Sequence, residues 1–227
     1  MFVKKLFLAI LPTVALSALP GLSRGDDATH VGIALTGGLS GVGVDAGVNV
    51  NNYLGVRGTI SGLSIGGDGA YGTSISWGAT LKLFQAGLLA DAYPFQGVFR
   101  VSGGVIDNGN KISLSAQQPH GTYTFNGASY SASQLGPATA SVEWRNADPY
   151  LGIGWGNLAG SRGLHFTSDV GILFSGSPKT MISVACASGQ SCPGLAANVA
   201  VENAKLQNDL SKVSVWPVLR FGIGYAF

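Results

Sequence analysis

The chain has 227 residues, of which 46% are hydrophobic and 11% are charged, whereas soluble domains carry about 25% charged residues. Glycine is abundant at 35 residues, yet no segment beyond the N-terminus has the roughly 18 consecutive apolar residues that a membrane helix needs. Without Lys4 and Lys5 the formal charge falls from +2 to 0, which argues against nucleic acid as a partner. Sparse charge without a helical span favours a membrane β-barrel.

The N-terminus has the composition of a secretory signal peptide. Lys4 and Lys5 precede the apolar stretch "LFLAILPTVALSAL", which is too short and too early to be a span of the mature protein. We expect cleavage between about residues 18 and 25. Residues 1–25 are then the signal peptide and 26–227 the outer-membrane barrel.

Further along, apolar residues recur at every second position, which is the period of a β-strand with one apolar face. Val31, Ile33 and Leu35 share a face, and the even positions of 41–50 do the same. A turn at Gly37-Gly38 would pair residue 35 with 40 and residue 33 with 42. The sequence predicts eight such segments: 30–36, 41–50, 53–64, 74–93, 98–109, 141–155, 164–174 and 214–227.

The charged residues fall opposite the main apolar faces, among Gly, Ser, Thr and Ala. A soluble sandwich would present a charge-dense face to water, whereas a narrow lumen needs a sparse face of small residues. The apolar face then meets lipid, where the sheet has to close so that every backbone group is bonded. The predicted lumenal polar network, with Asp169 paired to Arg220, consists of Asp45, Arg57, Lys82, Arg100, His165, Asp169 and Arg220.

The predicted fold is therefore all-β: an eight-stranded antiparallel transmembrane β-barrel with a short helix in an extracellular loop. An even strand number returns the chain to its starting side, with short turns on that side and long loops on the other. The expected periplasmic turns lie near 51–52, 94–97 and 157–163, and the expected extracellular breaks near 66–72, 107–140 and 177–211.

The sequence predicts three structural features within the loops: a helix, a disulfide and a small hairpin. Val199, Leu206 and Leu210 recur at roughly helical spacing, so we expect a helix within 193–212, acting as a lid or as a partner-binding cap. Cys186 and Cys192 predict a local disulfide in an exported chain, with two free thiols as the alternative. The "NG" dipeptide at 126–127 suggests a small hairpin.

The chain ends on Phe227, and Phe221, Ile223 and Tyr225 occupy alternate positions before it. This pattern resembles the terminal strand signal of outer-membrane β-barrels, which implies recognition by the barrel-assembly machinery; an ordinary soluble strand is the alternative. Trp155, Tyr93 and Tyr225 are candidates for an aromatic girdle at the membrane interface.

Several stretches, namely "LGVRGTISGLS", "DAYPF", "DPYLGIGWGN", "DVGILFSGSP" and the terminal strand, together resemble a family of small bacterial outer-membrane barrels, largely without assigned activity. More broadly, the chain looks like the eight-stranded OmpA/OmpX type. The resemblance implies the fold and outer-membrane location, and brings no catalytic residue with it.

One stretch of the sequence, "HFTSD" at 165–169, is a candidate for a catalytic site. The H-x-S arrangement of the lipid A deacylase family reads H-F-T here, so Thr167 stands at the nucleophile position, and Ser168 points away from His165. His30 and His120 have no partners at metal spacing, so we predict no metal and no cofactor.

The predicted function is thus a non-enzymatic barrel in contact with outer-membrane lipid, with an envelope-structural or surface-interaction role through its loops. The surface ligand is unknown. A narrow pore is the alternative, because eight strands enclose an interior that side chains just fill. A lipid A-modifying hydrolase is the weaker alternative.

Overall fold

The computed structural model describes residues 30–71, 75–116, 121–144 and 147–227, so the predicted signal peptide lies outside the described residues. In chain order, the elements are β1 (Val31–Gly38), β2 (Gly41–Asn51), β3 (Leu54–Tyr71), β4 (Ile75–Ala92), β5 (Phe99–Asn108), β6 (Lys111–Ala116), β7 (Thr122–Phe125), β8 (Ala128–Ser131), a 3₁₀ turn (Ala132–Gln134), β9 (Ala138–Glu143), β10 (Ala147–Trp155), β11 (Gly163–Leu173), β12 (Lys179–Ser183), α1 (Leu195–Leu210) and β13 (Trp216–Ala226).

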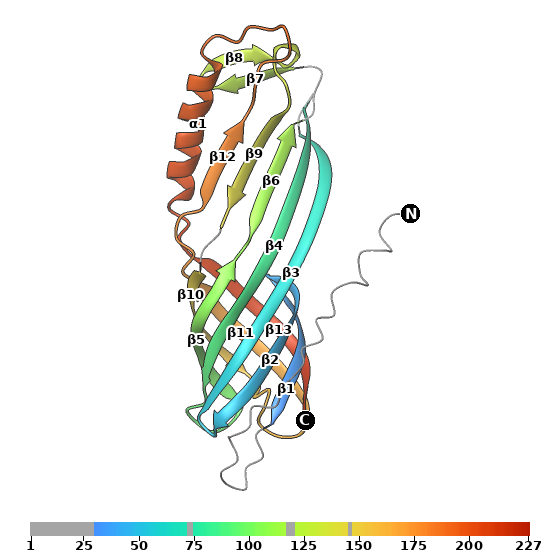
Figure 1. Cartoon of the computed structure of the whole chain (residues 1–227), viewed down its shortest axis with the longest axis vertical. Helices are drawn as coiled ribbons and strands as arrows, with labels where there is room; N and C mark the ends of the chain where they lie inside the picture. Colours follow the sequence, from blue (N-terminus) through green and yellow to red (C-terminus); the bar gives the residue numbers. More distant parts are fainter. Residues whose placement is uncertain (1–29, 72–74, 117–120, 145–146) are drawn as a thin grey trace, which may run out of the picture.

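Eight of these strands close a barrel. Each is bonded antiparallel to its two neighbours in the order β1, β2, β3, β4, β5, β10, β11, β13, and β13 returns to β1 through pairs from Gly32–Ala226 to Gly38–Arg220. The ring occupies the lower half of Figure 1. The predicted ring of eight antiparallel strands is confirmed.

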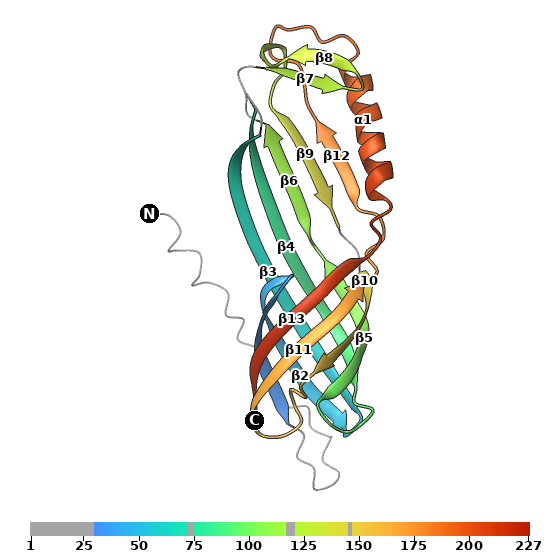
Figure 2. The same cartoon turned by 180° about the vertical axis from the view of Figure 1, so that it is seen from behind.

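The two longest strands, β3 and β4, span 18 residues each and continue beyond the ring (Figure 1). There β6 pairs with the first part of β4, β9 with β6, and β12 with β9. We use the name upper unit for β6 to β9, β12, α1 and the parts of β3 and β4 that lie beyond the Gly62 and Leu83 level. Both views show α1 beside β12 at the free edge of this sheet (Figures 1 and 2).

The upper unit corrects the predicted loops. The Gly-rich stretch 66–71 is strand, because its residues pair with Ile75–Thr80 of β4 and the ladder outweighs the flexibility of glycine. The expected breaks at 107–140 and 177–211 contain β6, β9 and β12. The predicted sixth segment is divided: its first residues end β9, and β10 alone joins the ring.

The upper unit has a small apolar core of its own. Tyr130, Leu135, Leu195 and Val199 are buried together, with Ile182 of β12 packed against them. The Cys186–Cys192 disulfide closes the segment before α1, and the hairpin β7–β8 turns at Asn126 and Gly127, both with positive φ. A helix, a disulfide and a hairpin are thus present where the sequence predicts them, and the extracellular position of the helix stays a prediction. No helix among the described residues is long and apolar enough to cross a membrane.

The first hairpin turns two residues later than predicted. Gly38 pairs with Gly41, so Leu39 and Ser40 form the turn, and Leu35 lies opposite Val44 and not residue 40. Strand β1 keeps Gly37 and Gly38 because β13 pairs with both on its other side. At Gly38 a Cβ would lie 1.9 Å from the Leu219 carbonyl oxygen, so glycine is needed there for close backbone approach, not for a turn.

The outer wall of the ring is apolar. Leu35, Leu88 and Phe166 are exposed by 72%, 68% and 76%, and alternate positions on every ring strand carry similar residues. The opposite face of the same strands is buried and polar. This is the reverse of a soluble domain, in which large apolar side chains turn inward.

Candidate functional site

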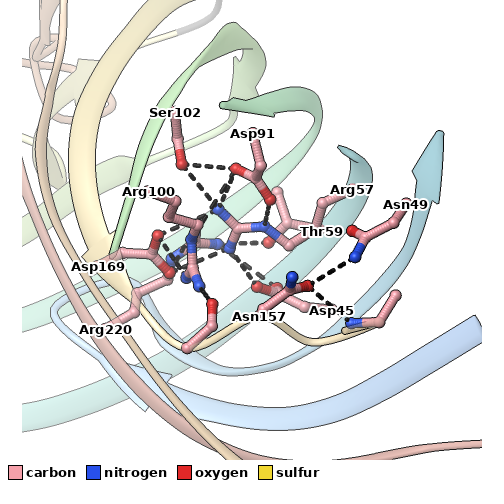
Figure 3. A network of polar contacts seen from close by, with 12 residues as sticks. Asp45, Asn49, Arg57, Thr59, Asp91, Arg100, Ser102, Asn157, Asp169 and Arg220 are labelled. Atoms are coloured by element: carbon pink, nitrogen blue, oxygen red, sulfur yellow. Dashed lines mark hydrogen bonds and ion pairs between the residues drawn. The ribbon is translucent and has the colours of Figure 1, made fainter. Parts of the chain in front are cut away.

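The barrel interior is organised around Arg57 of β3. Its guanidinium contacts three carboxylates: Asp45 at 2.8 Å from Nη1, Asp91 at 2.9 Å from Nε, and Asp169 at 3.0 Å from Nη1. Asp91 and Asp169 each accept a second bond from Nη2. Figure 3 shows these groups converging from separate strands, so the planar fork of one arginine ties β2, β3, β4 and β11 together.

Two further arginines complete this ion network. Arg100 of β5 donates from Nη2 to Asp169 at 2.9 Å and from Nη1 to the Gly156 carbonyl. Arg220 of β13 donates to Thr59 and lies 3.6 Å from Asp45 and 3.7 Å from Asp169. The network thus reaches six of the eight ring strands around the lumen: β2, β3, β4, β5, β11 and β13.

The network is balanced in charge and deeply buried. It contains three arginines and three aspartates, and none of these side chains exposes more than 4% of its surface. Charges this deeply buried are tolerated only when they are paired and hydrogen-bonded. The mutual neutralisation explains how a narrow interior holds six ionised groups.

An apolar layer lies next to the ion network, toward the upper unit. Leu89, Ile106, Tyr150, Leu173 and Val218 form one buried cluster, with Trp216 packed against it. Each comes from a different ring strand, so their side chains meet across the lumen. Together with the ion network, this layer fills the cross-section of the barrel.

Both ends of the interior are also occupied. At the end nearer the C-terminus, Leu158 and Ala159 of the β10–β11 turn are buried, and at Gly32 a Cβ would meet the Leu158 carbonyl oxygen at 1.9 Å. Glycine at that position is therefore what lets the turn fold into the barrel. At the other end, the rings of Trp144 and Trp216 stack edge to face at 5.2 Å.

The interior leaves little free volume. A cavity of about 10 Å³, lined by Arg57, Asp91, Tyr93 and Leu158 among others, has room for about one water molecule. A far larger hollow of about 870 Å³ lies on the outer wall over Phe166, Ser168 and Phe221. In the described part of the chain, the ion network and the apolar layer therefore both lie inside the barrel.

Five of the seven residues predicted for the lumenal network lie in it: Asp45, Arg57, Arg100, Asp169 and Arg220. Lys82 does not. It is exposed, lies on the outer face of β4 with Phe84 and Leu88, and pairs across the sheet with Lys111. The face of Leu83 and Leu89 is the interior one, so the predicted parity of β4 was wrong.

His165 also lies outside the network. Its Nε2 is 2.5 Å from the Ser161 carbonyl oxygen, at the end of the barrel, although its side chain shares a face with Thr167 and Asp169. Tyr93 is another correction: it is 3% exposed, so it is an interior residue and not part of an outer girdle, whereas Trp155 and Tyr225 do face outward.

Sequence reasoning missed Asp91, the second carboxylate held by Arg57, and Gln85, which accepts a bond from Ser40 at 2.7 Å. Both share the parity of Leu83 and Leu89 on β4. The available signal was Asp91 itself, because a carboxylate on a lipid-facing wall is costly and should have fixed the interior face of that strand.

The four C-terminal residues of the predicted assembly signal, Phe221, Ile223, Tyr225 and Phe227, all point outward and are between 42% and 60% exposed. In the described part of the chain, no cluster of three or more His, Cys, Asp or Glu side chains is arranged to hold a metal ion. Thr167, at the position of a candidate nucleophile, is buried beneath the outer wall.

Two comparisons of sequence, with family models and with curated proteins, gave no match. Comparison of structures gave Acinetobacter baumannii CarO2, at a TM-score of 0.58 and 18% identity over 88% of this chain and 100% of that one. Acinetobacter baumannii CarO matches at 0.56 and 19% over 86% and 97%. Both neighbours are outer-membrane β-barrel proteins, and at such identities the likeness establishes the fold alone.

Proposed function

We propose that this protein is a non-enzymatic transmembrane β-barrel of the outer membrane, whose closed barrel anchors the upper unit at the cell surface. The single observation that carries the proposal is an apolar outer wall around an interior filled by the ion network. The same arrangement would be unfavourable for a soluble protein, because Leu35 and Phe166 would be exposed to water while six charged side chains are buried.

Strand length supports the membrane-spanning role. A strand tilted across a bilayer needs about 9–11 residues. In the ring, β2, β11 and β13 have 11 residues, β5 has 10 and β10 has 9. Closure of the ring leaves no unpaired edge, which is what lipid requires. Outward-facing Phe221, Ile223 and Tyr225 fit the proposed recognition of the terminal strand by the barrel-assembly machinery.

Membrane residence is tested by fractionation and by gel mobility of unboiled and boiled samples. We expect enrichment in the outer membrane and a shift on boiling, because a closed barrel resists SDS until it is heated. A soluble periplasmic product without a shift would overturn the proposal. Phe227→Ala should lower the folded fraction in cells, and Val213→Ala, an exposed apolar position before β13, is its control.

The anchoring role is separated from the pore alternative by conductance in planar bilayers. The filled interior predicts no ion current above that of the bilayer, in wild type and in Lys82→Gln alike, since Lys82 lies outside the lumen. Regular conductance steps would make the protein a pore. Enlarged steps in Arg100→Ala would place that pore through the ion network.

The hydrolase alternative has its own readout. Cells that express the protein should retain all acyl chains of lipid A, with no difference between wild type and His165→Ala. Loss of an acyl chain from lipid A in wild type, but not in His165→Ala, would make the protein an enzyme. Binding of envelope or host polymers, lost when residues 193–212 are deleted, would assign the surface role to α1 and its flanks.

A further inference from the structure

A row of charged side chains crosses the outward face of the sheet where the upper unit leaves the ring. Lys82 of β4 lies opposite Lys111 of β6, Lys111 opposite Glu143 of β9, and Glu143 opposite Lys179 of β12. Directly opposed residues of a sheet point to the same side. At about 4.8 Å per strand the row is about 14 Å long, with a lysine at each end.

Each member of the row stands at the upper rim of the apolar wall. On β4, Lys82 lies on the same face as Phe84 and Leu88 and nearer the upper unit, and these two apolar residues are exposed by 36% and 68%. The chain runs from β5 through Lys111, from Glu143 into β10 and from β11 into Lys179. The row therefore continues the outer faces of four adjacent ring strands, β4, β5, β10 and β11.

The charge pattern of the row is unfavourable by itself. Lys82 and Lys111 are direct cross-strand neighbours, and like charges in that arrangement are destabilising. Glu143 forms an ion pair with Lys111 at 2.5 Å, whereas Lys82 and Lys179 are exposed and neither forms an ion pair with a carboxylate among the described residues. Three lysines against one glutamate leave a net positive strip that an anion would stabilise.

We propose that this row binds the phosphate groups of an anionic lipid in the outer leaflet, an inference that rests on the proposed membrane-spanning role. The lysine stems lie along the apolar wall and the ammonium groups reach the headgroup level. Acyl chains of the same lipid lie against Phe84 and Leu88 below. The lysines at the two ends of the row suit a lipid with two phosphates, such as lipid A.

The test titrates the folded protein, in neutral detergent, with lipid A, with phosphatidylcholine and with inorganic phosphate. Wild type should bind lipid A and not phosphatidylcholine, with affinity that falls as salt screens the charges. Replacing Lys82, Lys111 and Lys179 by Gln together should weaken binding of lipid A by roughly 100-fold, at about fivefold per lysine near a membrane surface. Lys212→Gln, at an exposed lysine beyond α1, should leave it unchanged.

A second variant should change the affinity for lipid A in the opposite direction. Glu143→Gln removes the negative charge of the row and should tighten binding of lipid A by about fivefold. Equal binding of lipid A by the triple variant and wild type, or weaker binding in Glu143→Gln, would overturn the proposal. Inorganic phosphate that competes at the same molar concentration as lipid A would also overturn it, since the acyl chains would then contribute nothing. If the triple variant still fractionates with the outer membrane and shifts on boiling, such a failure belongs to the row alone and not to the barrel.

Discussion

The barrel and the upper unit share two strands, β3 and β4, and these strands have opposite polarity in the two regions. In the ring, the interior faces of β3 and β4 carry Arg57, Thr59, Gln85 and Asp91, and the outer faces carry residues such as Ile60 and Leu88. In the upper unit, the continuation of the interior face carries Leu63, Ile65 and Leu81, while the outer face carries Ser64, Thr80 and Lys82.

The inversion takes place at one level of the sheet. Gly62 pairs with Phe84 and Leu63 with Leu83, and polarity changes on both strands within two residues of these pairs. The backbone continues unbroken through this point, so the change reflects the surroundings of each half and not a change of secondary structure. In the proposed arrangement the ring meets lipid, where apolar residues turn outward, and the upper unit meets water, where apolar residues lie on the opposite face, although Leu63 and Ile65 on that face are still 39% and 54% exposed.

The largest expected effect comes from removing the centre of the ion network. Arg57→Ala leaves Asp45, Asp91 and Asp169 buried without their shared cation, and breaking a buried ion pair in this way costs about 3–5 kcal/mol. We expect the folded, SDS-resistant band to be greatly reduced and the unfolding midpoint in urea to fall in detergent micelles.

The control for this variant is Arg162→Ala, because Arg162 is exposed in the β10–β11 turn. It should change stability by less than about 0.5 kcal/mol. If the two variants unfolded at the same urea concentration, the ion network would contribute nothing to the stability of the barrel.

The next effect is confined to the upper unit. Leu195→Ala removes a buried side chain from the small core beneath α1, and such truncations cost about 2–5 kcal/mol. Because this core shares no buried residue with the barrel interior, proteolysis within 177–212 should accelerate while the boiling shift stays normal. Loss of the SDS-resistant barrel in this variant would mean that the two regions fold as one unit.

A pair of lysine substitutions tests the position of the inversion. Leu88→Lys places a charge on the apolar wall and should cost about 2–4 kcal/mol at mid-membrane depth. Thr80→Lys, on the same face of the same strand beyond Lys82, should cost less than about 0.5 kcal/mol. Urea unfolding in lipid vesicles measures both, and equal costs would show that lipid does not end between the two positions.

The inversion also explains what the sequence could and could not predict. Strands that remain within the ring, such as β1, β11 and β13, keep one polarity throughout, so alternation alone identified their faces and placed Asp169 and Arg220 inside. Strand β4 crosses the boundary between the ring and the upper unit. Leu81, Leu83 and Leu89 alternate on one face of this strand, but Leu89 belongs to the ring and Leu81 to the upper unit, so the shared face is apolar for a different reason in each region. Leu83 and Leu89 are buried, Leu89 in the interior apolar layer, while Leu81 faces the upper unit.

The upper sheet was missed for a related reason. Segments such as "KISLSA" of β6 alternate, but they are short and lie between Gly-rich stretches that are typical of loops. Their strand character depends on pairing with the extended part of β4, which is remote in sequence and is not visible in local pattern. The helix, the disulfide and the Asn126-Gly127 hairpin depend on local spacing, and these were predictable.

The smallest expected effect comes from the disulfide. Replacing Cys186 and Cys192 by Ser opens a loop of only six residues' separation, and for so short a loop the chain-entropy model gives about 2 kcal/mol. An isolated β-bridge joins Cys186 to Leu135 of the upper unit. Loss of the disulfide should therefore destabilise the segment before α1 and leave the stability of the ring unchanged. Hydrogen exchange should therefore rise at 184–199 and stay unchanged in β10, β11 and β13. An equal rise in the ring strands would show that the upper unit transmits stability to the barrel along β3 and β4, which are the only described strands that belong to both regions.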